Sequence, residues 1–132
     1  MRGQRLFIRP IEASDHATVS RFLAEETGAA AIPACGLLGK LVGELVAIVE
    51  IHLTADAIQI DNVVVARDLR RKRIGRFMID EVAELAAKMD RRRLIVGEPA
   101  GADEFFQRTG FEREGARWIR YVRSQGAQRT SH

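Results

Sequence analysis

The chain has few of the residues that build disulfide-rich, proline-rich or membrane-spanning proteins. Its 132 residues include one cysteine, three prolines, one tryptophan and one tyrosine. The single cysteine, Cys35, excludes an internal disulfide framework and favours a reducing compartment, so we expect a cytoplasmic protein. The longest apolar stretch, residues 41–53, is interrupted by Glu44, Glu50 and His52, and we expect no secretory leader. We therefore expect no membrane span.

Two common phosphate-binding motifs are also missing. The Walker pattern G-x-x-x-x-G-K-[S/T] does not occur, and neither does the dinucleotide fingerprint G-x-G-x-x-G. These absences argue against a P-loop nucleotide-binding site and against a Rossmann dinucleotide-binding site. Residues 36–40, Gly-Leu-Leu-Gly-Lys, have the wrong glycine spacing for a nucleotide loop, so a strand of a hairpin is the better interpretation.

The length of the chain fits one domain, and its charge is unevenly divided. We expect a single domain over residues 1–123 with one sizeable core, followed by a polar, frayed tail at residues 124–132. Residues 1–66 hold 5 Lys or Arg and 8 Asp or Glu, whereas residues 67–132 hold 16 and 10, which gives a net charge of +3. A basic half suits a polyanionic ligand, and an acidic half suits a cationic one.

The most informative stretch runs from residue 58 to residue 89. Residues 58–65 are rich in β-branched side chains and predict a strand. A basic turn follows, and then a helix is predicted because apolar residues recur at helical spacing. The first turn of a helix has unpaired N–H groups and a positive dipole end, so this strand–turn–helix unit is suited to hold phosphate. The apolar residues of the helix are Ile74, Phe77, Met78, Val82, Leu85 and Met89.

Further elements are predicted on both sides of this unit. Ser14 is expected to cap a first helix that ends at Gly28. A short helix over residues 102–108 is expected to end at Gly110, with Phe111 completing a Schellman-like stop. The predicted order is strand, helix, three strands, helix, strand, helix and a last strand or hairpin. The remaining expected strands are residues 6–11, 45–53 and 94–96, with one bent strand or a short hairpin over 111–123.

Two motifs in this pattern resemble those of the GNAT superfamily of N-acetyltransferases. The run from Val65 to Gly75, V-x-x-x-x-R-x-x-R-x-G, resembles the acetyl-CoA signature, with Arg73 where the family usually has its first glycine. Residues 102–111, A-x-x-F-F-x-x-x-G-F, resemble the second motif of the family. The resemblance implies an α/β (α+β) GNAT-type acyl-CoA N-acyltransferase fold, with a mixed central sheet of about six to seven strands and about three to four helices.

The resemblance implies acetyl-CoA as cosubstrate, with no metal. Main-chain groups of Val63 and Val65 would pair with the pantetheine arm in a gap between the fourth and fifth strands. An amide near Val64 would polarise the thioester carbonyl. The pyrophosphate would lie against the basic turn, and the alternative for this turn is a solvated helix start. The residues of the turn are Arg70, Arg71, Lys72, Arg73, Ile74, Gly75 and Arg76.

By the same resemblance, the acceptor is a primary amine of a small molecule or a protein, which attacks the thioester directly in a ternary complex. A lysine-like amine has a pKa of about 10.4, so a carboxylate is needed to take its proton. Asp61 on the central strand is the first candidate and Glu50 on the neighbouring strand is the second. The alternative for each is a structural carboxylate.

At two positions the chain differs from the family pattern, and these differences leave other functions open. The family often protonates the departing thiolate with a tyrosine where this chain has Phe106, and an asparagine contact is replaced by Pro99. These changes fit a catalytically weak domain that binds or senses acyl-CoA. A small basic nucleic-acid-binding protein is less favoured, because only Phe77, Trp118 and Tyr121 are available to stack on bases. A homodimer through the C-terminal strands stays open.

Overall fold

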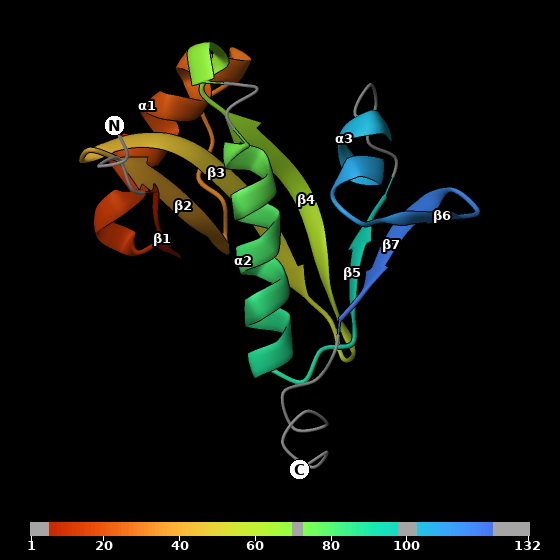
Figure 1. The fold of residues 1–132 in the computed structure, drawn as a ribbon. Helices are drawn as coiled ribbons and strands as arrows, with labels where there is room; N and C mark the ends of the chain where they lie inside the picture. Colours follow the sequence, from red (N-terminus) through yellow and green to blue (C-terminus); the bar gives the residue numbers. More distant parts are fainter. Residues whose placement is uncertain (1–5, 70–72, 98–102, 123–132) are drawn as a thin grey trace. The chain divides into compact units, whose positions relative to one another are not determined.

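The computed structural model describes residues 6–69, 73–97 and 103–122 (Figure 1). In this part of the chain seven strands form one mixed sheet in the order β1-β2-β3-β4-β5-β7-β6. β4 and β5 run parallel, whereas the β1–β2, β2–β3, β5–β7 and β6–β7 pairs are antiparallel. This confirms the predicted fold class. The elements are β1 (Leu6–Pro10), η1 (Ala13–Asp15), α1 (His16–Thr27), β2 (Gly36–Leu41), β3 (Glu44–Leu53), β4 (Ala57–Val65), η2 (Arg67–Leu69), α2 (Ile74–Lys88), β5 (Arg93–Val96), α3 (Asp103–Arg108), β6 (Glu112–Glu114) and β7 (Arg117–Tyr121).

Most expected elements are confirmed, with small shifts at their ends. The central strand begins at Ala57, one residue earlier than expected. The prediction that Ser14 caps the first helix is wrong, because Ser14 lies inside the 3-10 turn η1 and Asp15 precedes α1. The last strands form a short hairpin, β6 and β7, rather than one bent strand. The expected tail, residues 124–132, lies outside the described residues.

The chain forms two compact units. Unit 1 comprises Met1–Ile51 and Asn62–Met78, and unit 2 comprises His52–Asp61 and Ile79–His132. β3, β4 and α2 contribute residues to both units. The most deeply buried side chains include Val19, Leu38, Ile48, Val49 and Met78 in unit 1 and Ile58, Ile79, Val82, Leu94 and Ile119 in unit 2.

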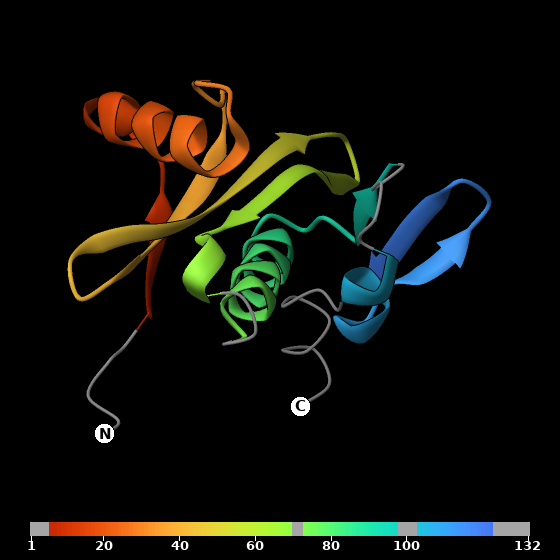
Figure 2. The same ribbon diagram turned by 90° about the horizontal axis from the view of Figure 1, so that it is seen from above.

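In unit 1, helices cover both faces of the strands β1 to β3 (Figure 2). α1 lies on one face and buries Val19, Phe22 and Leu23, which share one side of the helix. The first turns of α2 lie on the other face, where Met78 packs against Gly39. A Cβ atom at Gly39 would come within 2.9 Å of the Met78 Sδ atom. Glycine at this position of β2 therefore lets α2 approach the sheet closely.

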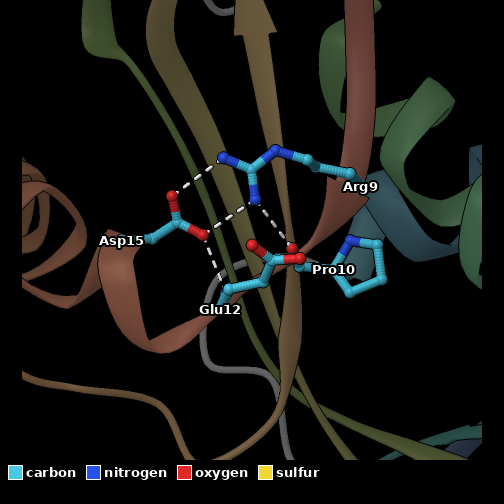
Figure 3. Close-up of polar contacts among 4 residues, drawn as sticks. All are labelled: Arg9, Pro10, Glu12 and Asp15. Atoms are coloured by element: carbon cyan, nitrogen blue, oxygen red, sulfur yellow. Dashed lines mark hydrogen bonds and ion pairs between the residues drawn. The ribbon is translucent and has the colours of Figure 1, made fainter.

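The turn from β1 into α1 is held by the Asp15 carboxylate (Figure 3). Arg9 donates from Nη1 to Oδ2 and from Nη2 to Oδ1, both at 2.8 Å, and the Glu12 N–H donates to Oδ2 at 2.7 Å. Arg9 also donates to the Pro10 carbonyl at 3.0 Å. The Arg9 and Glu12 hydrogen bonds hold the pKa of Asp15 well below its usual range. The ionised carboxylate thus fixes the direction in which the chain leaves β1.

In unit 2, α3 ends in a Schellman motif. Gly110 has a φ of 96°, in the left-handed region that favours glycine. The Phe111 N–H donates to the Phe106 carbonyl at 3.0 Å, and the Gly110 N–H donates to the Gln107 carbonyl at 3.3 Å. The buried Phe106 ring makes edge-to-face contacts with Phe105 and Phe111, at centroid distances of 5.0 and 5.3 Å. The predicted helix stop is therefore confirmed.

Candidate functional site

The end of β4 forms the first part of the candidate site. β4 pairs with β5 from Ala57↔Arg93 to Ile60↔Val96, and β5 ends at Val96. β4 itself continues to Val65, so residues 61–65 extend beyond the last pair of this ladder. Val63 and Val65, which are expected to pair with the pantetheine arm, and Val64, whose amide is expected to polarise the thioester carbonyl, all lie in this extension. Among them, the Val64 side chain is 6% exposed and belongs to the core.

The start of α2 forms the second part. Arg73 has a φ of 64°, in the left-handed region, and its carbonyl accepts the Phe77 N–H at 3.0 Å. This is the position where the family usually has a glycine, so the backbone keeps the glycine-like conformation without the glycine. Ile74 and Gly75 are buried, whereas Arg76 is exposed. The first N–H groups of a helix have no acceptor one turn earlier, which suits them to an anion.

The exposed side of α2 differs from the prediction. Phe77 was expected on the apolar face of the helix, but its side chain is 51% exposed. The buried stripe passes through Ile74, Met78 and Val82 and takes in Ile79 instead of Phe77. Other residues of the predicted site, Arg70, Arg71 and Lys72, lie outside the described residues, as does Pro99.

Asp61, the first candidate base, is the first residue of β4 beyond the β5 ladder. Its side chain is exposed, and Gln59 donates from Nε2 to Asp61 Oδ1 at 3.0 Å. The two residues are two positions apart in one strand, so their side chains share a face. This hydrogen bond orients the Asp61 carboxylate through Oδ1. Gln59 makes no hydrogen bond to Oδ2. Sequence reasoning missed Gln59, although its spacing from Asp61 was the available signal.

Glu50, the second candidate base, lies on β3 in unit 1, whereas Asp61 belongs to unit 2. It is half-buried and pairs with Gly36 of β2. A Cβ atom at Gly36 would clash with the Val49 carbonyl oxygen, so glycine is required opposite Glu50. The neighbouring Cys35 is a free, exposed thiol.

The aromatic residues considered as proton donors do not provide a phenol beside Asp61. Phe106 is a buried packing residue without a hydroxyl. Tyr121 pairs with Arg93, where the β4–β5 ladder begins, whereas Asp61 follows the last pair at the other end of that ladder. At roughly 3.3 Å per residue, the length of this ladder separates the two ends by about 10 Å. The Tyr121 hydroxyl donates to Glu114 Oε2 at 3.0 Å, which raises the pKa of the phenol.

The described residues contain neither a metal-binding cluster nor a membrane-spanning helix. Within residues 6–69, 73–97 and 103–122, no three His, Cys, Asp or Glu side chains gather in a group that would hold a metal ion. None of the helices in this described part is both long enough and apolar enough to cross a membrane.

Comparisons with known proteins agree with this arrangement. Residues 20–113 match the family model of the acetyltransferase (GNAT) domain. No curated protein sequence matches the chain. A GNAT acetyltransferase from Streptococcus pneumoniae is similar in structure, with a TM-score of 0.73 and 18% identity over 89% of this chain and 100% of that one.

Two similar structures contain CoA. The GNAT family N-acetyltransferase YhbS from Escherichia coli, solved with CoA, has a TM-score of 0.72 and 15% identity over 93% of this chain and 84% of that one. N-acetylglutamate synthase from Neisseria gonorrhoeae, solved with CoA and N-acetyl-glutamate, has a TM-score of 0.70 and 15% identity over 90% of this chain. This chain spans only 35% of that synthase. At these identities the structural likeness concerns the fold.

The family assignment rests on two agreeing observations. The matched segment, residues 20–113, covers well over half of the chain and includes the segment from β4 to α2 as well as α3. The mixed seven-stranded sheet with its parallel β4–β5 pair is the fold that the structural neighbours share. The chain therefore belongs to the GNAT acetyltransferase family.

Proposed function

We propose that this protein is an N-acetyltransferase that moves an acetyl group from acetyl-CoA to a primary amine of a small molecule or a protein. The observation that carries the proposal is one continuous segment in which β4 outruns β5 and leads through η2 to Arg73 and α2. This segment supplies strand backbone for an extended arm and helix-start N–H groups for a diphosphate. Family neighbours solved with CoA support the assignment.

In the proposed reaction, the neutral amine attacks the thioester carbonyl carbon directly, without an acyl-enzyme. A C–N bond forms, the C–S bond breaks, and the electron pair of that bond leaves with the thiolate. A thiol has a pKa of about 8.5, so the thiolate is a tolerable leaving group without an acid. An N–H near Val64 would stabilise the developing charge on the carbonyl oxygen.

Asp61 is the proposed acceptor of the amine proton, either directly or through one water molecule. Its position at the first residue beyond the β5 ladder supports this role, and so does the Gln59 hydrogen bond that orients it. Glu50 is the second choice. The proposal treats residues 1–123 as one catalytic domain and locates the reaction in the cytoplasm, where Cys35 would stay reduced.

The test is release of free CoA thiol from acetyl-CoA in the presence of a panel of small amines and peptides. We expect turnover with at least one amine, and we expect Asp61→Asn to lower kcat by about 10²–10⁴-fold, the usual contribution of a general base. The KM for acetyl-CoA should change little, because Asp61 does not contact the cosubstrate. Asp56→Asn, an exposed carboxylate near the other end of β4, is the matched control and should retain activity.

A second function is supported by one specific observation. Phe106 has no hydroxyl, and Tyr121 lies at the opposite end of the ladder from Asp61. An acyl-CoA-binding domain with little turnover would have no need of such a proton donor. Tight binding of acetyl-CoA with no thiol release on any amine would favour this alternative.

A nucleic-acid-binding function is disfavoured by the aromatic side chains. Of the three aromatic residues considered for stacking, Trp118 is 8% exposed and packs in the core. Phe77 and Tyr121 are exposed, on α2 and on β7. Binding of single-stranded nucleic acid with a steep salt dependence would revive this alternative.

A further inference from the structure

We propose that Glu26, in the last turn of α1, is a positioning residue for the CoA diphosphate. Its carboxylate holds the turn through which the chain leaves β4 on its way to α2. The inference rests on the proposed function, because it concerns the same CoA-binding segment. Glu26 itself would not touch the cosubstrate.

The contact joins residues that are far apart in the sequence. Glu26 Oε1 accepts the Arg67 N–H at 2.9 Å, across 41 residues. The Glu26 side chain is 17% exposed, whereas that of Arg67 is 70% exposed and its Nε lies 3.9 Å from the same oxygen. Both contacts use the same carboxylate oxygen, and the hydrogen bond from the backbone N–H is the shorter of the two. The exposed ion pair contributes little by comparison.

Glu26 occupies an unfavourable place in its own helix. A carboxylate in the last turn faces the negative end of the helix dipole, and this turn of α1 contains no basic residue. The hydrogen bond from Arg67 offsets this unfavourable interaction with the dipole of α1. Arg67 is the first residue of η2, where the backbone N–H groups lack acceptors within the helix and a carboxylate is favoured. Glu26 thus acts as an N-terminal cap for η2, supplied by a distant helix.

Two backbone hydrogen bonds complete the attachment of this turn. The Ala66 N–H donates to the Val46 carbonyl of β3 at 2.8 Å, and the Leu69 N–H donates to the Ala66 carbonyl at 2.9 Å. The chain that leaves β4 is therefore attached to β3 and to α1 before α2 begins. Residues 66–69 are the last described residues before the start of α2 at residues 73 and 74. Loss of the Glu26 contact would misplace the N–H groups proposed to hold the diphosphate.

The experiment compares Glu26→Ala with wild type on two acetyl donors. Acetyl-CoA carries the diphosphate, whereas S-acetylpantetheine does not. We expect the Kd for CoA to rise about tenfold, since one charge-assisted hydrogen bond is worth a free energy of that order. The KM for S-acetylpantetheine and the kcat should stay within about twofold, because no contact to the pantetheine arm is lost.

Four further variants separate this role from a general effect on stability. Glu26→Met keeps the length of the side chain without the acceptor, so it should reproduce the loss even if the alanine variant folds poorly. Glu26→Gln keeps an oxygen at the same place and should restore near-normal binding. Arg67→Ala keeps the backbone N–H, and Glu25→Ala changes an exposed carboxylate of the same turn, so both should bind CoA normally.

Three results would overturn the inference: unchanged CoA binding in the alanine and methionine variants, equal losses with both acetyl donors, or an Arg67→Ala variant as impaired as Glu26→Ala. A wild-type protein that binds no CoA would instead contradict the proposed function. The two failures are therefore distinguishable.

Discussion

The turn before α1 in unit 1 and the turn after α3 in unit 2 are fixed in different ways. In unit 1, Asp15 holds the turn between β1 and α1, and Glu26 holds η2 after β4, each by accepting a backbone N–H. In unit 2, the turn after α3 has Gly110 in the left-handed region, and the Thr109 hydroxyl and the Arg120 guanidinium donate to carbonyl groups of this turn. A carboxylate can join segments distant in sequence and can titrate, whereas the effect of a glycine is local and independent of pH.

Arg73 lies between these two cases. It belongs to unit 1 and has a left-handed φ of 64°, yet it is neither glycine nor asparagine. Such a conformation costs a non-glycine residue about 1–2 kcal/mol. Backbone strain of this kind persists where the surrounding structure enforces it and often lies at functional sites. The strain at the start of α2 therefore supports the proposed phosphate-binding role of that segment.

The largest effect on stability is expected at the glycine-dependent turn. Gly110→Ala should lower the free energy of unfolding by about 1–2 kcal/mol, because alanine is disfavoured at a φ of 96°. Urea unfolding at neutral pH measures this change. Gly97→Ala is the matched control, because a Cβ atom there meets no described atom within 4 Å, and it should change stability by less than about 0.5 kcal/mol. Equal effects at the two glycines would contradict the account of the α3 turn.

A smaller, pH-dependent effect is expected at the carboxylate-dependent turn. The pKa of Asp15 is lowered in the folded protein, so its contribution to stability is present above the ordinary carboxyl pKa of about 3.9 and is lost as the pH falls below it. Asp15→Asn should therefore melt at a lower temperature than wild type at pH 7, and the difference should shrink at acidic pH. The deficit of Gly110→Ala should stay the same at both pH values. A deficit of Asp15→Asn that does not depend on pH would remove the distinction between the two kinds of turn.

The smallest effect is expected at Arg73, and it has the opposite sign. Arg73→Gly relieves the left-handed strain but adds chain entropy to the unfolded state, so we expect a net stabilisation of about 0.5–1 kcal/mol. Equilibrium unfolding measures it, and CoA binding should be retained. Arg76→Gly, inside α2, is the control and should instead destabilise by about 0.5–1 kcal/mol. A loss of stability in Arg73→Gly would show that the arginine side chain makes a compensating contact.

The sequence predicted features that depend on local pattern. The segment from β4 to α2, the strand that follows it and the helix stop at Gly110 were predicted from residue types and spacings that lie close together in the sequence. The left-handed conformation of Arg73 was not predicted from the sequence. Ser14 was misassigned because a 3-10 turn precedes the helix and takes in the residue that resembled a cap.

Features that depend on tertiary contacts could not be predicted. The Glu26–Arg67 hydrogen bond spans 41 residues, so no local pattern reveals it. An acidic residue in the last turn of a helix is unfavourable there, which indicates only that it has a partner elsewhere. The exposure of Phe77 depends on which flank of the apolar stripe meets the sheet, and helical spacing alone does not decide that. The position of Tyr121 along β5 depends on the strand register.

The most direct test of the central claim is a calorimetric titration of the wild-type protein with CoA and, separately, with pantetheine. The claim is that the segment from β4 to α2 holds the diphosphate of CoA. It predicts saturable binding of CoA that also raises the melting temperature, with much weaker binding of pantetheine. Equal affinity for the two ligands, or no binding of either, would contradict it.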